Sequence, residues 1–409
     1  MNKRDILIYG AAAVSIGYIF SIASGSIGLM LLMAAWLLNY KSIEFKNIRQ
    51  KKELLILVAF FLFFAASISW SVNWYQGQKE VVRFLGYVLF PLVFLTVPPI
   101  SSEEKRKVFR IFIHALSLFF VVCLITAIIR QIGFYNRGGI FNWYYFYRYD
   151  FLEVFDQHPT YVSMFTLLSL TILLTKGKQI ISSKIFLYVT SILQIAAIIL
   201  YGSRMGYILF VIVAGLFCIR FLKNKTNRKK IRYSVLFITI TGVFLFGIWN
   251  IPIVKERVLY TFGYEYEYQF NNNENIIDST PEEKGRLLLW TDVLEVIKEK
   301  PIFGQGAGSG KQVLLKKYEE KQHNLFFEEQ YNAHNTYLEF WLQGGIILML
   351  LYIGLLTTIF KQSLKKKKLI LFVFGLIITL TSLTESIFIA QGILFFSFFY
   401  SFLMSSSYE

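Results

Sequence analysis

The chain is organised as a series of long apolar stretches separated by short polar segments. About 20 apolar residues in a helix cross the roughly 30 Å hydrocarbon core of a membrane. In lipid every backbone polar group must be satisfied within the protein, so runs of this length predict spanning helices. We expect about twelve spans, at residues 5–23, 26–40, 54–71, 81–97, 108–131, 158–175, 185–201, 204–222, 232–250, 335–360, 369–383 and 386–404.

Composition agrees with this pattern. The 409 residues are 55% hydrophobic and 17% charged, with a mean hydropathy of +0.51, which is more apolar than a soluble chain of this length. The sequence therefore predicts an all-α, polytopic membrane protein with one large extracytoplasmic loop that contains helices.

The positive charges predict the orientation. With a cytoplasmic N-terminus, the inside loops and span ends carry 26 of the 42 Lys and Arg residues, and the short outside loops carry few. The positive-inside rule therefore predicts a multi-pass protein with both termini in the cytoplasm. The net charge of +16 does not indicate a nucleic-acid partner, because the charge lies between spans and not on a soluble basic module.

Three regions follow from this topology. Residues 1–250 hold the first nine spans, residues 251–334 form the extracytoplasmic loop, and residues 335–409 hold the last three spans. A capping box of Thr280, Pro281 and Glu283 predicts a helix that ends near Lys300. We expect one face of it to carry Trp290, Val293, Leu294 and Ile297, with Asp292, Glu295, Lys298 and Glu299 elsewhere.

Two arginines stand where an anion could bind. Arg204 lies in a four-residue outside turn, where its guanidinium either snorkels to lipid headgroups or binds a phosphate or pyrophosphate; position alone favours neither. Arg286 lies near the start of the loop helix and could act on an anion together with the helix N-terminus. An exposed helix arginine is the simpler interpretation of Arg286.

The polar side chains at the ends of the spans include a candidate base. His334 stands where the loop enters the next span, and imidazole titrates near neutrality, so it could deprotonate a hydroxyl. His158 also begins a span on the outside. We interpret His114 as buried packing and His323 as solvated. Glu385, between the last two spans, either holds an arginine in place or caps a helix.

Two other segments have simpler explanations than chemistry. Residues 304–311 are glycine-rich, but Gln305 and Gln312 replace residues that a phosphate-binding Walker loop requires, so we expect a flexible turn. Residues 134–155 include eleven aromatic side chains, which an interfacial belt explains better than sugar stacking.

No metal site or cofactor is expected. The chain has only five aspartates and no clustered His, Cys or Asp set, and both cysteines lie in apolar runs. Cationic side chains would have to stabilise developing negative charge instead.

From about residue 155 to residue 400 the chain resembles the O-antigen ligase and O-antigen polymerase superfamily of bacterial glycosyltransferases, in motif order as well as content. The motifs that carry the resemblance are Gly202-Ser203-Arg204, Gly285-Arg286 with Trp290, Pro301-Ile302-Phe303-Gly304-Gln305-Gly306, His334-Asn335-Thr336-Tyr337-Leu338-Glu339, and Gly344-Gly345. His158-Pro159-Thr160-Tyr161, Thr384-Glu385-Ser386 and Gln391-Gly392 are similar to a subset of members.

The resemblance implies metal-independent glycosyl transfer from an undecaprenyl-pyrophosphate-linked donor on the periplasmic face. His334, Arg286 and Arg204 would then be the catalytic residues. The implied substrate-binding set is Arg204, Arg286, Asn335, Tyr337, His158, Tyr161 and Glu385. The acceptor would be lipid A core for a ligase or a growing glycan for a polymerase, and the shared motifs leave both open.

A lipid-glycan flippase or other transporter is the alternative from another class. Such proteins carry charged residues in the middle of spans and helices broken at the midplane. The predicted spans are largely free of central charge, which favours the transferase.

Overall fold

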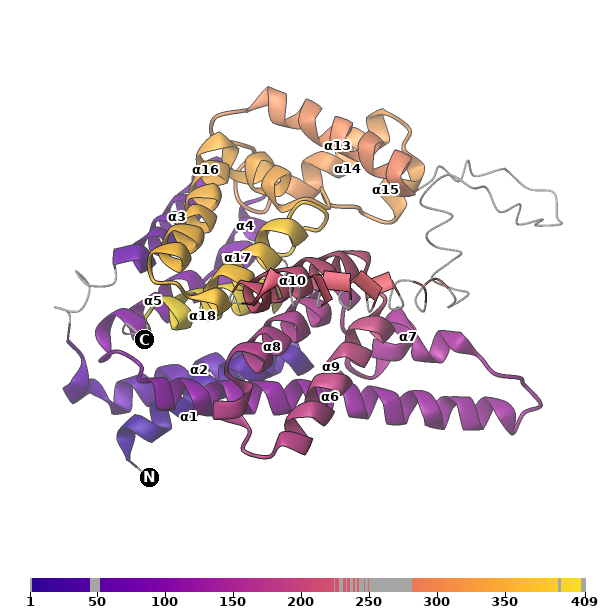
Figure 1. The fold of residues 1–409 in the computed structure, drawn as a ribbon. Coiled ribbons are helices and arrows are strands. Elements are labelled where there is room, and N and C mark those ends of the chain that lie inside the picture. Colours follow the sequence, from indigo (N-terminus) through magenta and orange to yellow (C-terminus); the bar gives the residue numbers. More distant parts are fainter. Residues whose placement is uncertain are drawn as a thin grey trace.

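The computed structural model describes residues 2–44, 52–223, 282–388 and 391–405, with isolated positions between 225 and 249. This described part is helical and contains no strand, so the predicted all-α class is confirmed for it (Figure 1). The helices in the first half are α1 (Lys3–Phe20), α2 (Ile22–Leu38), α3 (Leu55–Ala66), α4 (Trp74–Arg83), α5 (Gly86–Thr96), α6 (Ser102–Tyr135), α7 (Arg148–Leu152), α8 (Pro159–Ile180), α9 (Lys184–Tyr201) and α10 (Arg204–Leu222). Those of the second half are α13 (Glu282–Glu299), α14 (Gly310–Glu320), α15 (Asn324–Glu328), α16 (Thr336–Lys365), α17 (Leu369–Thr381) and α18 (Gln391–Met404).

Short 3₁₀ turns extend several of these helices. They are η1 (Tyr40–Ser42), η3 (Lys52–Leu54), η4 (Ser67–Trp70), η5 (Trp143–Phe146) and η6 (Glu153–Phe155).

Six helical segments are long and apolar enough to cross a membrane, so this is a multi-pass membrane protein. They are Lys52–Trp70, Ser102–Tyr135, Pro159–Ile180, Lys184–Tyr201, Arg204–Leu222 and Thr336–Lys365. Ile22–Leu38, Leu369–Thr381 and Gln391–Met404 are shorter apolar helices. The predicted total of about twelve spans is not established, and the predicted span 232–250 lies outside the described residues apart from isolated positions.

The predicted span 81–97 differs from the structure. A short amphipathic helix, α4, ends at Arg83, and a separate apolar helix, α5, follows it. The cause is local: Lys79, Glu80 and Arg83 give α4 a polar face, which holds it at the surface. The 11 residues of α5 extend only about 17 Å, which is less than the thickness of the hydrocarbon core.

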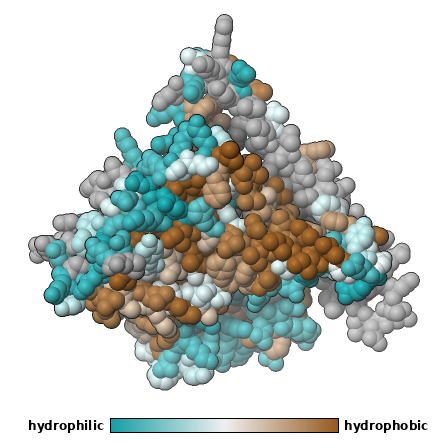
Figure 2. Space-filling model, turned by 90° about the horizontal axis from the view of Figure 1, so that it is seen from below, coloured by the Kyte–Doolittle hydropathy of each residue, from teal (hydrophilic) through white to brown (hydrophobic). Residues whose placement is uncertain are grey.

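The centre and the periphery of the bundle are both apolar. Every residue of α18 is buried, and α18 packs against α1 and α5. Helices on the outside, such as α2 and α9, instead expose large apolar side chains, including Met30 and Ile185. Figure 2 shows a broad hydrophobic area on one face of the molecule. A surface of this kind is the one expected to contact lipid.

Helices α13, α14 and α15 form a separate small unit at one end of the bundle, next to α16 (Figure 1). Its apolar core contains Leu289, Val293, Val296, Ile297, Leu314, Tyr318 and Phe326. The predicted loop helix is confirmed to within about two residues, although the capping box at Thr280 and Pro281 lies outside the described residues. The predicted apolar face was wrong at Leu294, which is 39% exposed.

An ion network holds this unit together. Asp292, which we expected on the polar face, is fully buried and accepts hydrogen bonds from Lys321 Nζ (2.9 Å) and His323 Nδ1 (2.7 Å). The prediction of a solvated His323 was therefore wrong. Lys321 and Lys317 also pair with Glu295 and hold the pKa of that carboxyl at about 2. The buried carboxylate of Asp292 is tolerated because its charge is paired with Lys321 and His323.

The glycine-rich segment 304–310 is buried, so the expectation of a flexible turn was wrong. Its backbone N–H groups bind the carbonyls of Leu342 and Gln343 on α16 (both 2.8 Å). On its other side, Ser71 Oγ donates to the Ala307 carbonyl (2.8 Å), at the end of η4. Segment 304–310 therefore joins the unit of α13, α14 and α15, the loop unit, to two membrane helices. Glycine allows the backbones to approach this closely.

Gly345 interrupts α16 at the point of that junction. Its φ of +68° and ψ of −171° are not helical, and Ile346 N–H donates to the Pro301 carbonyl (2.9 Å) in place of an intrahelical partner. A Cβ at Gly345 would lie 2.0 Å from the Ile302 carbonyl oxygen. The break in α16 is thus filled by backbone of the loop.

Candidate functional site

His334 stands in a strained turn just before α16. Its φ of +42° is left-handed, and its N–H donates to Asn332 Oδ1 (2.8 Å). Asn335 caps the helix, because its Oδ1 accepts the N–H groups of Tyr337 (2.9 Å) and Leu338 (3.2 Å). The Asn side chain therefore ends the turn and fixes the backbone from which the imidazole projects.

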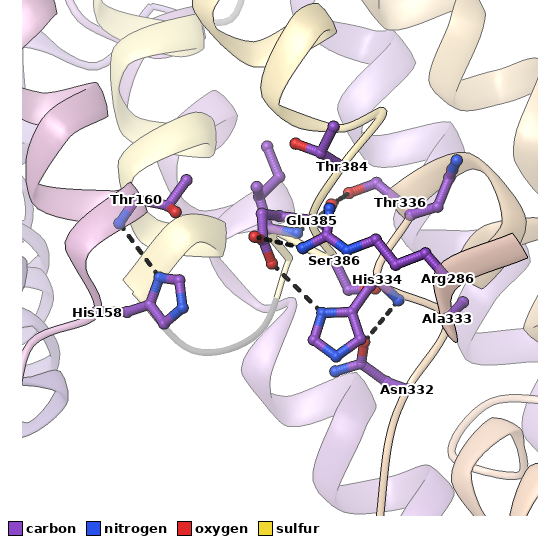
Figure 3. A network of polar contacts seen from close by, with 12 residues as sticks. His158, Thr160, Arg286, Asn332, Ala333, His334, Thr336, Thr384, Glu385 and Ser386 are labelled. Carbon is purple, nitrogen blue, oxygen red and sulfur yellow. Dashed lines mark hydrogen bonds and ion pairs between the residues drawn. The ribbon is translucent and has the colours of Figure 1, made fainter. Parts of the chain in front are cut away.

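The His334 ring and the Arg286 guanidinium both point toward the Glu385 carboxylate (Figure 3). His334 Nδ1 lies 3.4 Å from Glu385 Oε2, and Arg286 Nη2 lies 3.5 Å from Oε1. The three side chains are 31%, 26% and 21% exposed, so the cluster is half-buried. Of the two roles expected for Glu385, holding an arginine is the one that the geometry supports.

Electrostatics keep Glu385 ionised. Burial opposes its charge, but the hydrogen bond with His334 and the electrostatic effect of His158, Arg286 and His334 outweigh burial and lower its pKa. An ionised carboxylate can only accept, so His334 Nδ1 must be the donor in this bond. The other ring nitrogen, Nε2, then carries the lone pair when the imidazole is neutral.

The segment around Glu385 is fixed to the start of α16. Thr336 N–H donates to the Ser382 carbonyl (2.9 Å), and Thr336 Oγ1 donates to the Glu385 carbonyl (2.8 Å). Asn335 Nδ2 donates to the Leu383 carbonyl (3.2 Å). These bonds bring two motifs that are about 50 residues apart into one rigid unit.

The loop helix is fixed to the same turn. Trp290 Nε1 donates to the Ala333 carbonyl (2.9 Å), next to His334. Trp290 lies one helical turn after Arg286 on α13, so this bond sets the distance between the arginine and the histidine.

His158 lies on the opposite side of Glu385 from Arg286 (Figure 3). His158 caps α8, with its Nδ1 accepting the Thr160 N–H (3.2 Å). Burial lowers the pKa of His158 despite the nearby Glu385 charge, so the ring is neutral at pH 7. The Tyr161 hydroxyl donates to the Ser386 carbonyl (3.5 Å), and Tyr337 donates similarly to the Thr379 carbonyl (3.1 Å).

Arg204 is the first residue of α10. Gly202, with a φ of +64°, ends α9, and Ser203 caps α10 by accepting the Gly206 N–H (3.1 Å). Ser203 Oγ lies 3.4 Å from Thr160 Oγ1, so the N-termini of α8 and α10 lie side by side. Two adjacent helix N-termini add positive potential to the arginine.

Arg148 is a residue that sequence reasoning missed. Its backbone is left-handed (φ +55°), its guanidinium lies over the Tyr149 ring, and its buried Nε has no hydrogen-bond partner. A Cβ at Gly202 would lie 2.4 Å from Arg148 Cγ, so glycine makes room for this side chain beside Arg204. The charge of Arg148 also acts on His158. Its only signal in the sequence is an arginine within the aromatic segment 134–155.

Arg286, His334 and His158 act on the Glu385 carboxylate, and Arg204 begins α10 at a helix N-terminus that lies beside the start of α8, with Arg148 against Gly202. Such a cationic cluster with a base can bind a phosphate-type anion and take up a proton. Within the described part of the chain, no three His, Cys, Asp or Glu side chains gather as a metal site would require. Metal-free chemistry stays a prediction.

Comparison with known proteins gives one family. Residues 189–353 match the family model described as O-antigen ligase. An uncharacterized protein of Haemophilus influenzae is 30% identical over 191 residues, which are 45% of this chain and 44% of that protein. A Rickettsia conorii protein named "Putative polysaccharide ligase" is 25% identical over 249 residues, or 58% and 53% of the two chains. The chain thus spans about half the length of these relatives.

The matched region includes Arg204, Arg286 and His334, whereas His158, Tyr161 and Glu385 lie outside it. The predicted resemblance to the O-antigen ligase superfamily is confirmed.

Proposed function

Because residues 189–353 match the O-antigen ligase family model in a multi-pass membrane protein, we propose that this chain is a glycosyltransferase of the ligase type. It moves a glycan from undecaprenyl pyrophosphate to a hydroxyl of lipid A core, on the periplasmic face of the inner membrane. The observation that carries the proposal is the convergence of His334 and Arg286 on Glu385, beside the paired helix N-termini that present Arg204.

The arginines hold the donor in this mechanism. Arg204 and Arg286 bind the pyrophosphate through their planar guanidinium groups and stabilise the charge that grows as the glycosidic bond breaks. Arg148 provides a further positive charge at the same end of the bundle. Glu385 balances Arg286 until the donor arrives.

His334 acts as the base. Its Nδ1 is held by Glu385, and Nε2 takes the proton of the acceptor hydroxyl as that oxygen attacks the anomeric carbon. The bond between the anomeric carbon and the pyrophosphate oxygen breaks, and undecaprenyl pyrophosphate leaves. Direct displacement inverts the configuration at this carbon. Nuclear magnetic resonance of the product tests this step, and a retained configuration would contradict it.

A repeat polymerase is the second candidate, because it shares the donor and the chemistry. The name of the Rickettsia relative favours the ligase. Gene deletion with glycolipid gels separates the two. Loss of the ladder with retained lipid-linked polymer indicates a ligase, and single repeats on core indicate a polymerase. Lipid-linked glycan that stays on the cytoplasmic face would indicate a transporter instead.

The structure gives little support to the transporter. The central parts of the six candidate span helices carry no Asp, Glu, Lys or Arg. Helix α16 is broken at Gly345, but loop backbone fills that break.

The two arginines can be tested directly. Arg204→Ala or Arg286→Ala is expected to lower transfer by about 100- to 1,000-fold, because each removes a charge that stabilises the leaving pyrophosphate. Lysine should restore little activity at either position, since it lacks the bidentate fork. The measurement is transfer by purified protein from a lipid-linked donor.

Arg130→Ala is the matched control. Arg130 pairs with Glu153 (2.5 Å) and lies over the Tyr145 ring, so its loss should leave transfer near the wild-type rate. Wild-type transfer by Arg204→Ala or Arg286→Ala would show that the arginine concerned is not needed.

The lowered pKa of Glu385 predicts that the stability of the protein depends on pH. The folded-state pKa of this carboxyl is lowered from an ordinary value of 4.5, so its contribution to stability is present above that value and is lost as the pH falls through the lowered pKa. Glu385→Gln should therefore lower the Tm at pH 7, and the difference from wild type should shrink below about pH 4.5. Thermal unfolding in detergent measures this. A Tm difference that does not change with pH would contradict the assigned ion pairs.

A further inference from the structure

A groove of about 580 Å³ lies away from the His334 cluster, where the loop unit meets the membrane helices. It is lined by Trp70, Lys300, Pro301, Ile302, Phe303 and Gly304. Ile302 and Phe303 are adjacent in the chain, and their side chains are 55% and 56% exposed. Adjacent large apolar side chains on a surface indicate contact with an apolar partner.

Two backbone carbonyls of the groove have hydrogen-bond partners within the protein. The Pro301 carbonyl accepts from Trp341 Nε1 (3.0 Å) and from the Ile346 N–H (2.9 Å). The Phe303 carbonyl accepts from Trp70 Nε1 (3.1 Å). A carbonyl that is already satisfied by the protein loses no hydrogen bond when an apolar group covers it. The occupant is therefore expected to be a hydrocarbon chain.

The position of the groove agrees with a lipid. Trp70 is the last residue of the candidate span Lys52–Trp70, so the groove opens at the boundary between membrane and water. The indole N–H groups of Trp70 and Trp341 both donate to backbone carbonyls of the groove. Tryptophan is enriched at membrane interfaces for this combination of polar and apolar character.

Lys300 supplies a positive charge at the rim of the groove, which favours a lipid with an anionic headgroup. It follows α13, whereas Arg286 lies near the other end of that helix, 14 residues earlier. The two cations are therefore about 21 Å apart along the axis. A lipid whose phosphates are bound at Arg286 would not also place a phosphate at Lys300, so the groove serves a second lipid.

We propose that this groove binds an anionic phospholipid of the bilayer, with an acyl chain along Trp70, Ile302 and Phe303 and the headgroup phosphate at Lys300. That the groove takes a second lipid, and not the glycan donor, rests on the proposed binding of the donor pyrophosphate at Arg286. The structural consequence is a lipid contact at the junction where loop backbone enters the break in α16.

The test uses the full chain in nanodiscs that contain phosphatidylcholine and a trace of phosphatidylglycerol with a photoactivatable acyl chain. Cross-linked peptides are mapped by mass spectrometry. We expect Trp70 and residues 300–304 to be labelled more than Leu62, a lipid-exposed residue of the same span. We expect about fivefold more label from phosphatidylglycerol than from phosphatidylcholine with the same chain, which one lysine near a headgroup can produce.

Lys300→Gln should lower that ratio to about one, because it removes the rim charge without changing the apolar walls. Lys316→Gln, on the exposed side of α14, should leave the ratio unchanged. Labelling of Leu62 equal to that of the groove, or a ratio insensitive to Lys300→Gln, would overturn the proposal. Displacement of the label by a polyprenyl monophosphate, and not by phosphatidylglycerol, would assign the groove to the donor chain and also overturn it.

Discussion

Replacing His334 by alanine is expected to lower glycan transfer by about a thousandfold while the protein still folds. The reason is that the imidazole is the candidate base at the cluster, held by Glu385 through Nδ1 with Nε2 left to accept a proton. Its side chain is 31% exposed and fills no core cavity, so its removal should cost little stability. The measurement is the rate of transfer per folded protein, with donor binding measured separately.

His114→Ala is the control for this prediction, since His114 lies on α6 and contacts Phe186. It should keep the wild-type rate. A His334→Ala protein with more than half of the wild-type rate would contradict the assignment of the base. Unchanged donor binding together with a lost rate would support a chemical role over a binding role.

Replacing Gly345 by alanine is expected to prevent the accumulation of stable protein. At φ +68° and ψ −171° only glycine is comfortable, and an alanine Cβ would lie 2.0 Å from the Ile302 carbonyl oxygen. Strain and overlap together should cost more than about 3 kcal/mol, because the contacting atoms are backbone and cannot rotate away. Fluorescence size-exclusion chromatography and Tm in detergent measure the loss.

Gly215→Ala provides a matched change, because no atom lies within 4 Å of a Cβ at that position on α10. It should be neutral or slightly stabilising, as alanine favours helix over glycine. If Gly345→Ala accumulated with a wild-type Tm, the close contact between loop and α16 would not be required for folding.

Much of the site was predictable where the cause is local. Asn335 caps α16 through bonds to residues two and three positions on, and Gly202 and Ser203 end one helix and begin the next within two residues. Turn and cap preferences act over such short distances, so the placement of His334 and Arg204 at helix starts follows from the sequence.

Other assignments failed because their partners are far away in the chain. Asp292 was expected away from the apolar face of its helix but is buried, because its partners Lys321 and His323 lie about 30 residues further on. The glycine-rich segment 304–310 was expected to be a flexible turn, but its backbone forms hydrogen bonds with Leu342 and Gln343. Contacts between residues so far apart in the chain cannot be predicted from the periodicity of apolar positions.

The sequence by itself determined that the chain is a helical membrane protein, because the length of an apolar run sets the length of a span. It also determined which family the chain resembles, through motifs that stand in the same order. Only the tertiary structure decided that Glu385 meets both His334 and Arg286, that Arg148 lies beside Arg204, and that loop backbone occupies the break in α16. These pairings depend on how helices distant in the chain pack, and packing is decided by the whole molecule.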